Sequence, residues 1–126
     1  MNFTLLMYIG FGGFLGAISR FVISNFIQRQ VNILFPIGTL SVNILGSFII
    51  VFMAMFFQNI IEPEYKALVI TGFLGALTTF STFSLENVNM LQDGDYSRFA
   101  LNVTLNITLT LGATISAIIL FKKIYI

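Results

Sequence analysis

The chain has 126 residues, of which 57% are hydrophobic and 9% are charged, and its mean hydropathy is +0.96. This composition is too apolar for a soluble domain of the same length, so it indicates a protein that lives in a lipid bilayer. The absence of cysteine and histidine excludes disulfides, thiolate chemistry and imidazole catalysis, while a net charge of +1 adds nothing about partners.

The sequence contains four long stretches without charged residues. Each has a length close to the roughly 20 residues that a helix needs to cross a bilayer. We therefore expect an all-α integral membrane protein with four transmembrane helices. The linkers between them are short, so the whole chain, 1–126, is expected to form one four-helix transmembrane domain. The helices are predicted over about 1–26, 36–57, 66–91 and 97–121.

The first span is rich in glycine and contains one arginine. Gly12 and Gly16 are four residues apart, a spacing that lets helix backbones approach closely in a membrane. Arg20 has no acid within a turn of its own helix. It must either reach the interface or bind backbone carbonyls, a polar cavity or another helix.

The second span carries a single asparagine in an otherwise apolar stretch, LSVNILGSF. This residue, Asn43, lies three positions before Gly46. A buried asparagine can join two helices, and its amide can also donate to a ligand inside the bundle. Both interpretations stay open at this point.

The third span contains GALTTFSTFS, in which the triplet Thr-Phe-Ser occurs twice. In a helix this repeat would place Phe80 and Phe83 on one face. Gly72 and Gly75 lie upstream and the repeated residue types are indifferent helix formers, so the backbone is expected to unwind around 75–79. A break within the membrane is tolerated only where protein or a water-filled cavity satisfies the freed groups. The stretch is therefore either a kinked helix with packed phenylalanines or an ion site.

The polar groups of the spans favour an anion over a cation. Glu86 is the only carboxylate within an apolar span, so a cation filter built from carboxylates is not expected. The remaining groups are mostly donors, and phenylalanine edges carry the positive part of the ring quadrupole. Two crowded phenylalanines favour a small anion. Whether Glu86 faces a vestibule or caps a helix partner stays open.

The fourth span carries a polar stripe with a spacing of four residues, which places its members along one helix face. Such a stripe lines either a helix interface or a wet path, and the sequence does not separate the two. The stripe consists of Asn102, Asn106, Thr110 and Thr114, with Thr104 and Thr108 beside it.

Basic residues, which usually set the orientation of a membrane protein, are balanced between the two sides. Either so few charges do not report orientation, or the chain inserts both ways up and oppositely oriented copies pair. One side carries Lys66, Lys122 and Lys123, and the other carries Arg29 and Arg98, with Arg20 if it reaches the interface.

Three segments, GGFLGAISRF, GTLSVNILGSF and GFLGALTTFSTFS, resemble the CrcB or Fluc family of fluoride channels, and the resemblance covers nearly the whole chain. It implies an antiparallel, dual-topology homodimer that conducts fluoride passively out of the cytoplasm through two pores. It also implies a location in the cell membrane, as a multi-pass protein of a bacterial plasma membrane. The expected partners are fluoride, a second copy and membrane lipid, with no nucleic acid.

The resemblance also implies site residues. The phenylalanines matched by Phe80 and Phe83 contact fluoride edge-on in that family, and the asparagine matched by Asn43 donates to it. A structural sodium ion lies at the dimer centre, bound by backbone carbonyls matched by Gly75 and Thr78.

Further pore residues are expected from the repeat, namely Ser81 and Thr82. The fourth span is the weakest match to the family. Its candidate lining residues, Thr104, Asn106 and Thr108, are therefore left open.

Two other classes of protein remain as alternatives. A small exporter of the multidrug-resistance type has a similar length, but resembles antiporters with an essential glutamate in the first helix, and residues 1–19 contain no acid. A structural subunit of a larger complex would leave the polar groups of the second and third spans unexplained. We do not expect an enzyme, because no pair of nucleophile and base is recognisable.

Overall fold

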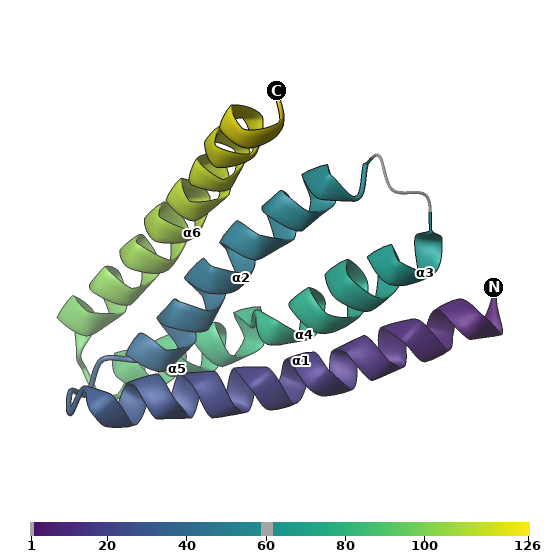
Figure 1. The fold of residues 1–126 in the computed structure, drawn as a ribbon. Coiled ribbons are helices and arrows are strands. Elements are labelled where there is room, and N and C mark those ends of the chain that lie inside the picture. Colours follow the sequence, from purple (N-terminus) through teal and green to yellow (C-terminus); the bar gives the residue numbers. More distant parts are fainter. Residues whose placement is uncertain (1, 59–61) are drawn as a thin grey trace.

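The computed structural model describes residues 2–58 and 62–126, and contains four helical segments long and apolar enough to cross a membrane. The predicted all-helical fold with four spans is thus confirmed (Figure 1). The third span is made of consecutive pieces, including a π-helix, η1. In chain order the elements are α1 (Phe3–Gln30), α2 (Ile37–Phe56), α3 (Pro63–Lys66), η1 (Ala67–Leu74), α4 (Gly75–Leu77), α5 (Phe80–Gln92) and α6 (Tyr96–Tyr125).

The first and last helices are longer than the sequence predicts, because both continue beyond the apolar stretch into basic residues. Helix α1 has Arg29 in its last turn, and α6 has Lys122 and Lys123 in its last turn. Positive charge near a helix C-terminus interacts favourably with the helix dipole, so these residues extend the helices rather than end them. The predicted linker over 58–65 includes residues 59–61, which lie outside the described residues.

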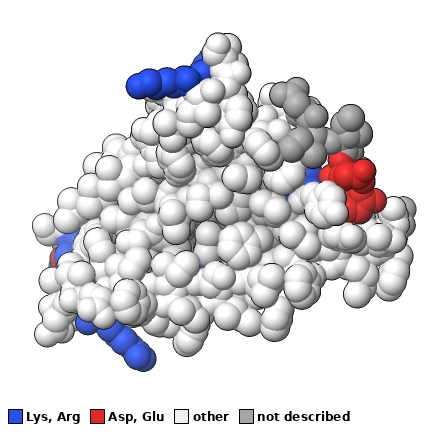
Figure 2. Space-filling model, viewed as in Figure 1, with Lys and Arg blue, Asp and Glu red and all other residues white. Residues whose placement is uncertain are grey.

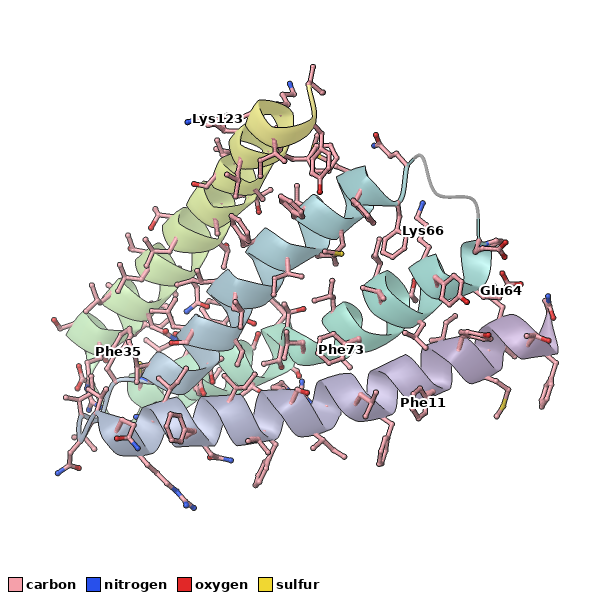
Figure 3. The ribbon with its side chains drawn as sticks, in the orientation of Figure 1. Phe11, Phe35, Glu64, Lys66, Phe73 and Lys123 are labelled. Carbon is pink, nitrogen blue, oxygen red and sulfur yellow. The ribbon has the colours of Figure 1, made fainter. Side chains whose placement is uncertain are left out.

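The helices are arranged as two closely packed pairs. Helix α1 packs along η1 and α4, and α2 packs along α6. Figure 1 shows that the α1–α2 and α5–α6 connections lie together, at the lower left, and that α1 and α6 diverge from there. Aromatic side chains such as Phe11, which is 59% exposed, point away from the other helices (Figure 3). Charged side chains gather at the margins of the face in Figure 2, and its middle is uncharged, as a membrane-facing surface requires.

Glycine allows the close approach of α1 and the third span. A Cβ atom added at Gly12 would lie 2.1 Å from the Leu68 carbonyl oxygen, and one added at Gly16 would lie 2.1 Å from the Phe73 carbonyl oxygen. Backbone atoms cannot move aside as a flexible side chain can. The predicted packing role of these two glycines is therefore confirmed.

The connection between α1 and α2 is organised by the side chain of Gln28. Its Nε2 donates to the carbonyl oxygens of Ile33 at 3.1 Å and Phe35 at 3.0 Å. Its Oε1 accepts the Gly38 N–H at 3.1 Å, in the first turn of α2. One amide thus satisfies backbone groups that the turn and the helix start leave without partners.

The connection between α5 and α6 is organised by Asp95, which caps the N-terminus of α6. Its Oδ1 accepts the Arg98 N–H at 3.0 Å, and its Oδ2 pairs with the Arg98 guanidinium. The pKa of Asp95 lies below its usual value because hydrogen bonds from Arg98 stabilise the charged carboxylate. The bond from the Arg98 backbone N–H contributes most, and the bond from its guanidinium comes second. Arg98 also donates to the Leu34 carbonyl at 3.2 Å, which links this connection to the one between α1 and α2.

We predict that Gly12→Ala and Gly16→Ala each lower the melting temperature of the protein in detergent. The added methyl group meets a backbone oxygen, and overpacking of this kind costs roughly 1–3 kcal/mol. Gly10→Ala on the same helix is the control, because a Cβ atom there meets nothing within 4 Å. Equal melting temperatures for all three variants would contradict the close packing of α1 on η1.

Candidate functional site

The third span is interrupted between α4 and α5. Thr78 (φ −80°, ψ 155°) and Thr79 (φ −150°, ψ 114°) have extended backbone, whereas Gly75 keeps helical angles (φ −62°, ψ −33°). The sequence predicts unwinding around 75–79, and the extended residues are limited to the last two of these. The reason is that the helical bond from the Thr78 N–H to the Leu74 carbonyl still forms, at 3.3 Å.

Asn43 of α2 supplies partners for the extended backbone. Its Oδ1 accepts the Thr79 N–H at 2.8 Å, and its Nδ2 donates to the Thr79 carbonyl at 3.2 Å. The side-chain amide of Asn43 therefore forms the same two hydrogen bonds with Thr79 that a backbone N–H and carbonyl would form. Gly46, one helical turn further along α2, leaves the space that the Thr78 side chain occupies, since a Cβ atom there would lie 2.3 Å from Thr78 Cγ2. Of the two roles open for Asn43, joining two helices is confirmed.

Thr79 also caps the N-terminus of α5. Its Oγ1 accepts the Thr82 N–H at 3.2 Å and donates to Thr82 Oγ1 at 3.0 Å. Ser81 Oγ lies 3.3 Å from the same oxygen. The hydroxyls of Ser81 and Thr82 are thus gathered around the interruption, with Thr79 as their shared partner. The Ser84 hydroxyl instead donates to the Phe80 carbonyl of its own helix at 2.9 Å.

A cavity of about 310 Å³ opens beside the interruption. The rings of Phe80 and Phe83 stand on its wall, with centroids 5.5 Å apart and planes inclined by 47°. Phe80 is 78% exposed, so this part of the wall is open in the single chain. None of the described residues that line this cavity carries a carboxylate. The lining residues are Asn43, Ser47, Ile50, Thr78, Thr79, Phe80, Phe83, Asn106, Ile107 and Thr110.

A second, more polar cavity of about 490 Å³ is also lined by Thr79. Arg20 and Glu86 stand on its wall, together with Gln28 and Thr39. Glu86 Oε1 accepts a hydrogen bond of 2.5 Å from the Thr39 hydroxyl, and Glu86 Oε2 is buried without a partner among the described residues. Of the alternatives for Arg20, a position beside a polar cavity is the one that the structure supports.

The polar stripe of α6 divides into amides that cross to other helices and hydroxyls that do not. Asn106 and Asn102 are buried, and bond to Asn43 of α2 and Asn87 of α5, respectively. Thr108 is exposed and its hydroxyl donates to the Thr104 carbonyl of its own helix at 2.7 Å. Of the three candidate lining residues on this helix, only Asn106 lines the cavity beside Phe80.

The predicted pore residues do not all meet at one point. Asn43, Phe80 and Phe83 line the first cavity, and Thr82 lines the second. Ser81 is exposed and lines neither. The sequence did not point to Asn87, whose importance comes from its contact with α6. It marked Thr79 only as part of the repeat and of the stretch expected to unwind.

Comparisons with known proteins match nearly the whole chain. The family model described as "CrcB-like protein, Camphor Resistance (CrcB)" matches residues 7–118. The protein named fluoride-specific ion channel FluC from a Nitratiruptor species is 59% identical over 125 residues, covering 99% of this chain and 98% of the relative. The protein of the same name from a Sulfurovum species is 59% identical over 121 residues, covering 96% of each. One from Campylobacter fetus subsp. fetus is 51% identical over 108 residues, covering 84% of each.

We predict that Asn43→Leu lowers the melting temperature and speeds amide hydrogen exchange at Thr79. Leucine has a similar volume but no polar atoms, so the Thr79 N–H and carbonyl lose their partners, at roughly 1–3 kcal/mol for each buried group. Ser47→Ala is the control, because Ser47 lines the same cavity and its hydroxyl enters none of the hydrogen bonds of the described residues. Unchanged exchange at Thr79 in Asn43→Leu would show that Asn43 does not hold the segment.

Proposed function

The chain belongs to the CrcB-like family, and we propose that it is a fluoride channel that lets fluoride leave the cytoplasm down its gradient. Family membership confirms the resemblance recognised in the sequence. The observation that carries the proposal is the 59% identity, over 99% of the chain, to a relative named as a fluoride-specific ion channel. The chain is a multi-pass integral membrane protein. The relatives are named as ion channels, which agrees with the expectation that the chain is not an enzyme.

The chemistry of the cavity beside Phe80 supports a small anion as the conducted ion. Its wall combines two phenylalanine rings with amide and hydroxyl groups, and no carboxylate is among the described residues that form it. Ring edges and N–H or O–H donors stabilise negative charge, whereas carboxylates would repel it. Fluoride is small and strongly hydrated, so a pore must replace its water with closely placed groups of this kind.

We further propose that two oppositely oriented copies associate and complete two pores. Phe80 stands on the cavity wall and is 78% exposed, so one chain leaves this side of the cavity open. Polar groups such as Asn43 would then face lipid, which is unfavourable. A second copy would close the wall. The balance of basic residues between the two sides of the membrane favours insertion in both orientations.

A structural sodium ion on the two-fold axis, bound by the carbonyls of Gly75 and Thr78, is part of the same proposal. In a helix these carbonyls would accept the N–H groups of Thr79 and Thr82. The Thr79 N–H donates to Asn43 Oδ1 instead, and the Thr82 N–H donates to the Thr79 hydroxyl. Both carbonyls therefore lack their usual donor in a region where water is scarce. A cation shared between two copies would satisfy them.

We predict that the purified protein in liposomes carries fluoride without a proton gradient, and that Phe80→Ile and Phe83→Ile reduce this flux at least about ten-fold. Isoleucine keeps apolar bulk but lacks the polarised ring edge. Phe3→Ile is the control, because Phe3 is 75% exposed, close to the 78% of Phe80, and lies at the start of α1. An ion-selective electrode measures the efflux. Proton-coupled export of organic cations without fluoride flux would instead identify an exporter.

We predict that Gly75→Val converts the dimer to monomers and abolishes the flux. Gly75 is exposed in the single chain, and a Cβ atom added there would meet only the Ile70 carbonyl oxygen, at an ordinary 3.6 Å. A Cβ atom therefore fits at this position within the subunit, and a strong effect of the exposed valine would report a partner. Gly112→Val, at a site with open space, is the control. Size-exclusion chromatography and sodium analysis of the purified protein are the measurements, and a sodium-free dimer with normal flux would contradict the sodium site.

A further inference from the structure

Four asparagines from three helices form a continuous chain of side-chain hydrogen bonds beside the cavity at Phe80. Asn43 Nδ2 of α2 donates to Asn106 Oδ1 of α6 at 3.2 Å. Asn106 Nδ2 donates to Asn102 Oδ1 at 2.9 Å, one turn earlier on the same helix. Asn102 Nδ2 donates to Asn87 Oδ1 of α5 at 2.9 Å. The last three side chains are buried, with Asn102 fully inaccessible.

This chain of hydrogen bonds has a direction, because the NH₂ groups of Asn43, Asn106 and Asn102 each donate to the next asparagine in the order Asn43, Asn106, Asn102, Asn87. Three hydrogen bonds to the backbone hold this direction. Asn43 pairs with the N–H and carbonyl of Thr79, and Asn106 Nδ2 also donates to the Asn102 carbonyl at 3.0 Å. If either amide turned over, two donors or two acceptors would face each other in a buried place, which is costly. Asn87 Oδ1 is the final acceptor of the chain.

This arrangement occupies both amide hydrogens of Asn43. One is donated to the Thr79 carbonyl and the other to Asn106 Oδ1. Asn43 and Asn106 both line the cavity beside Phe80. An anion that accepts from Asn43 in this cavity must therefore take a hydrogen from the Thr79 carbonyl or from the Asn106 oxygen. Loss of the bond to Thr79 would leave a carbonyl of the extended backbone without its donor, so the hydrogen held by Asn106 is the one that costs less to release. The anion and Asn106 compete for one donor.

We propose that Asn106 is the resting acceptor for the Asn43 donor, and that Asn102 and Asn87 are positioning residues that keep the Asn106 oxygen turned toward Asn43. This inference rests on the proposed function as a fluoride channel. The apparent affinity of a site falls with the fraction of time that its binding-competent state is populated. The asparagine chain thus weakens fluoride binding at Asn43, and it raises the fluoride concentration at which the flux saturates.

The test is the dependence of fluoride flux on fluoride concentration in liposomes, measured for each folded variant. Asn106→Leu removes the competing oxygen, and the half-saturating fluoride concentration should fall by about five-fold, the effect of one net hydrogen bond. Asn87→Leu removes the last acceptor, loosens Asn106 and should give a smaller fall. Asn89→Leu is the matched control on α5 and should leave the value unchanged, because Asn89 is exposed and its side chain enters none of the hydrogen bonds of the described residues.

A double-mutant cycle separates positioning from a general structural role. If Asn87 acts through Asn106, Asn87→Leu should have no further effect in a protein that already carries Asn106→Leu. Equal effects of Asn87→Leu in both backgrounds would overturn the proposal, and so would half-saturating concentrations that stay at the wild-type value. Asn87→Ser, whose shorter side chain stops short of Asn102 but keeps a polar atom, replaces Asn87→Leu if the leucine variant does not fold. Absence of flux from the wild-type protein would overturn the proposed function itself, and this inference with it.

Discussion

The pairing of the Asn43 amide with the backbone of Thr79 is the interaction on which the rest of the site depends. Extended backbone inside a bilayer leaves N–H and carbonyl groups that neither lipid nor the helix can satisfy. Asn43 satisfies both groups of Thr79, at 2.8 and 3.2 Å. The break in the third span can therefore persist. Because it persists, Thr79 is free to cap α5 with its hydroxyl, and Phe80 and Phe83 begin a new helix at the cavity wall.

The four spans could be predicted from the sequence because their cause is local. Length without charge decides whether a segment can cross a bilayer, and both are visible in the sequence. The ends of the helices were less predictable, since Arg29 and Lys123 look like boundaries when only hydropathy is considered. In the structure they lie in last helical turns, where the helix dipole favours them. Phe80 and Phe83 drew attention because they belong to an unusual local repeat, while their contact with fluoride stays a prediction.

The remaining parts of the site could not be predicted, because they depend on pairs of residues far apart in the sequence. Thr39 donates to Glu86 across 47 positions, and Asn43 donates to Asn106 across 63 positions. Nothing in a single sequence gives the rotation of one helix against another, which decides whether such groups meet. Asn87 illustrates this limit. It lies one turn beyond Phe83 on α5, but its importance comes from Asn102 of α6.

The polar stripe of α6 shows why the kind of polar side chain matters as much as its position. A hydroxyl in a membrane helix can donate to the carbonyl four residues earlier, as Thr114 does to Thr110 at 2.8 Å, and its hydrogen is then used within the helix. An asparagine has two hydrogens and an oxygen, so it can bond to its own helix and still reach a neighbour. Asn106 does both, with bonds to the Asn102 carbonyl and from Asn43. Amides therefore connect helices at the cavity, whereas the Thr114 hydroxyl donates only within its own helix.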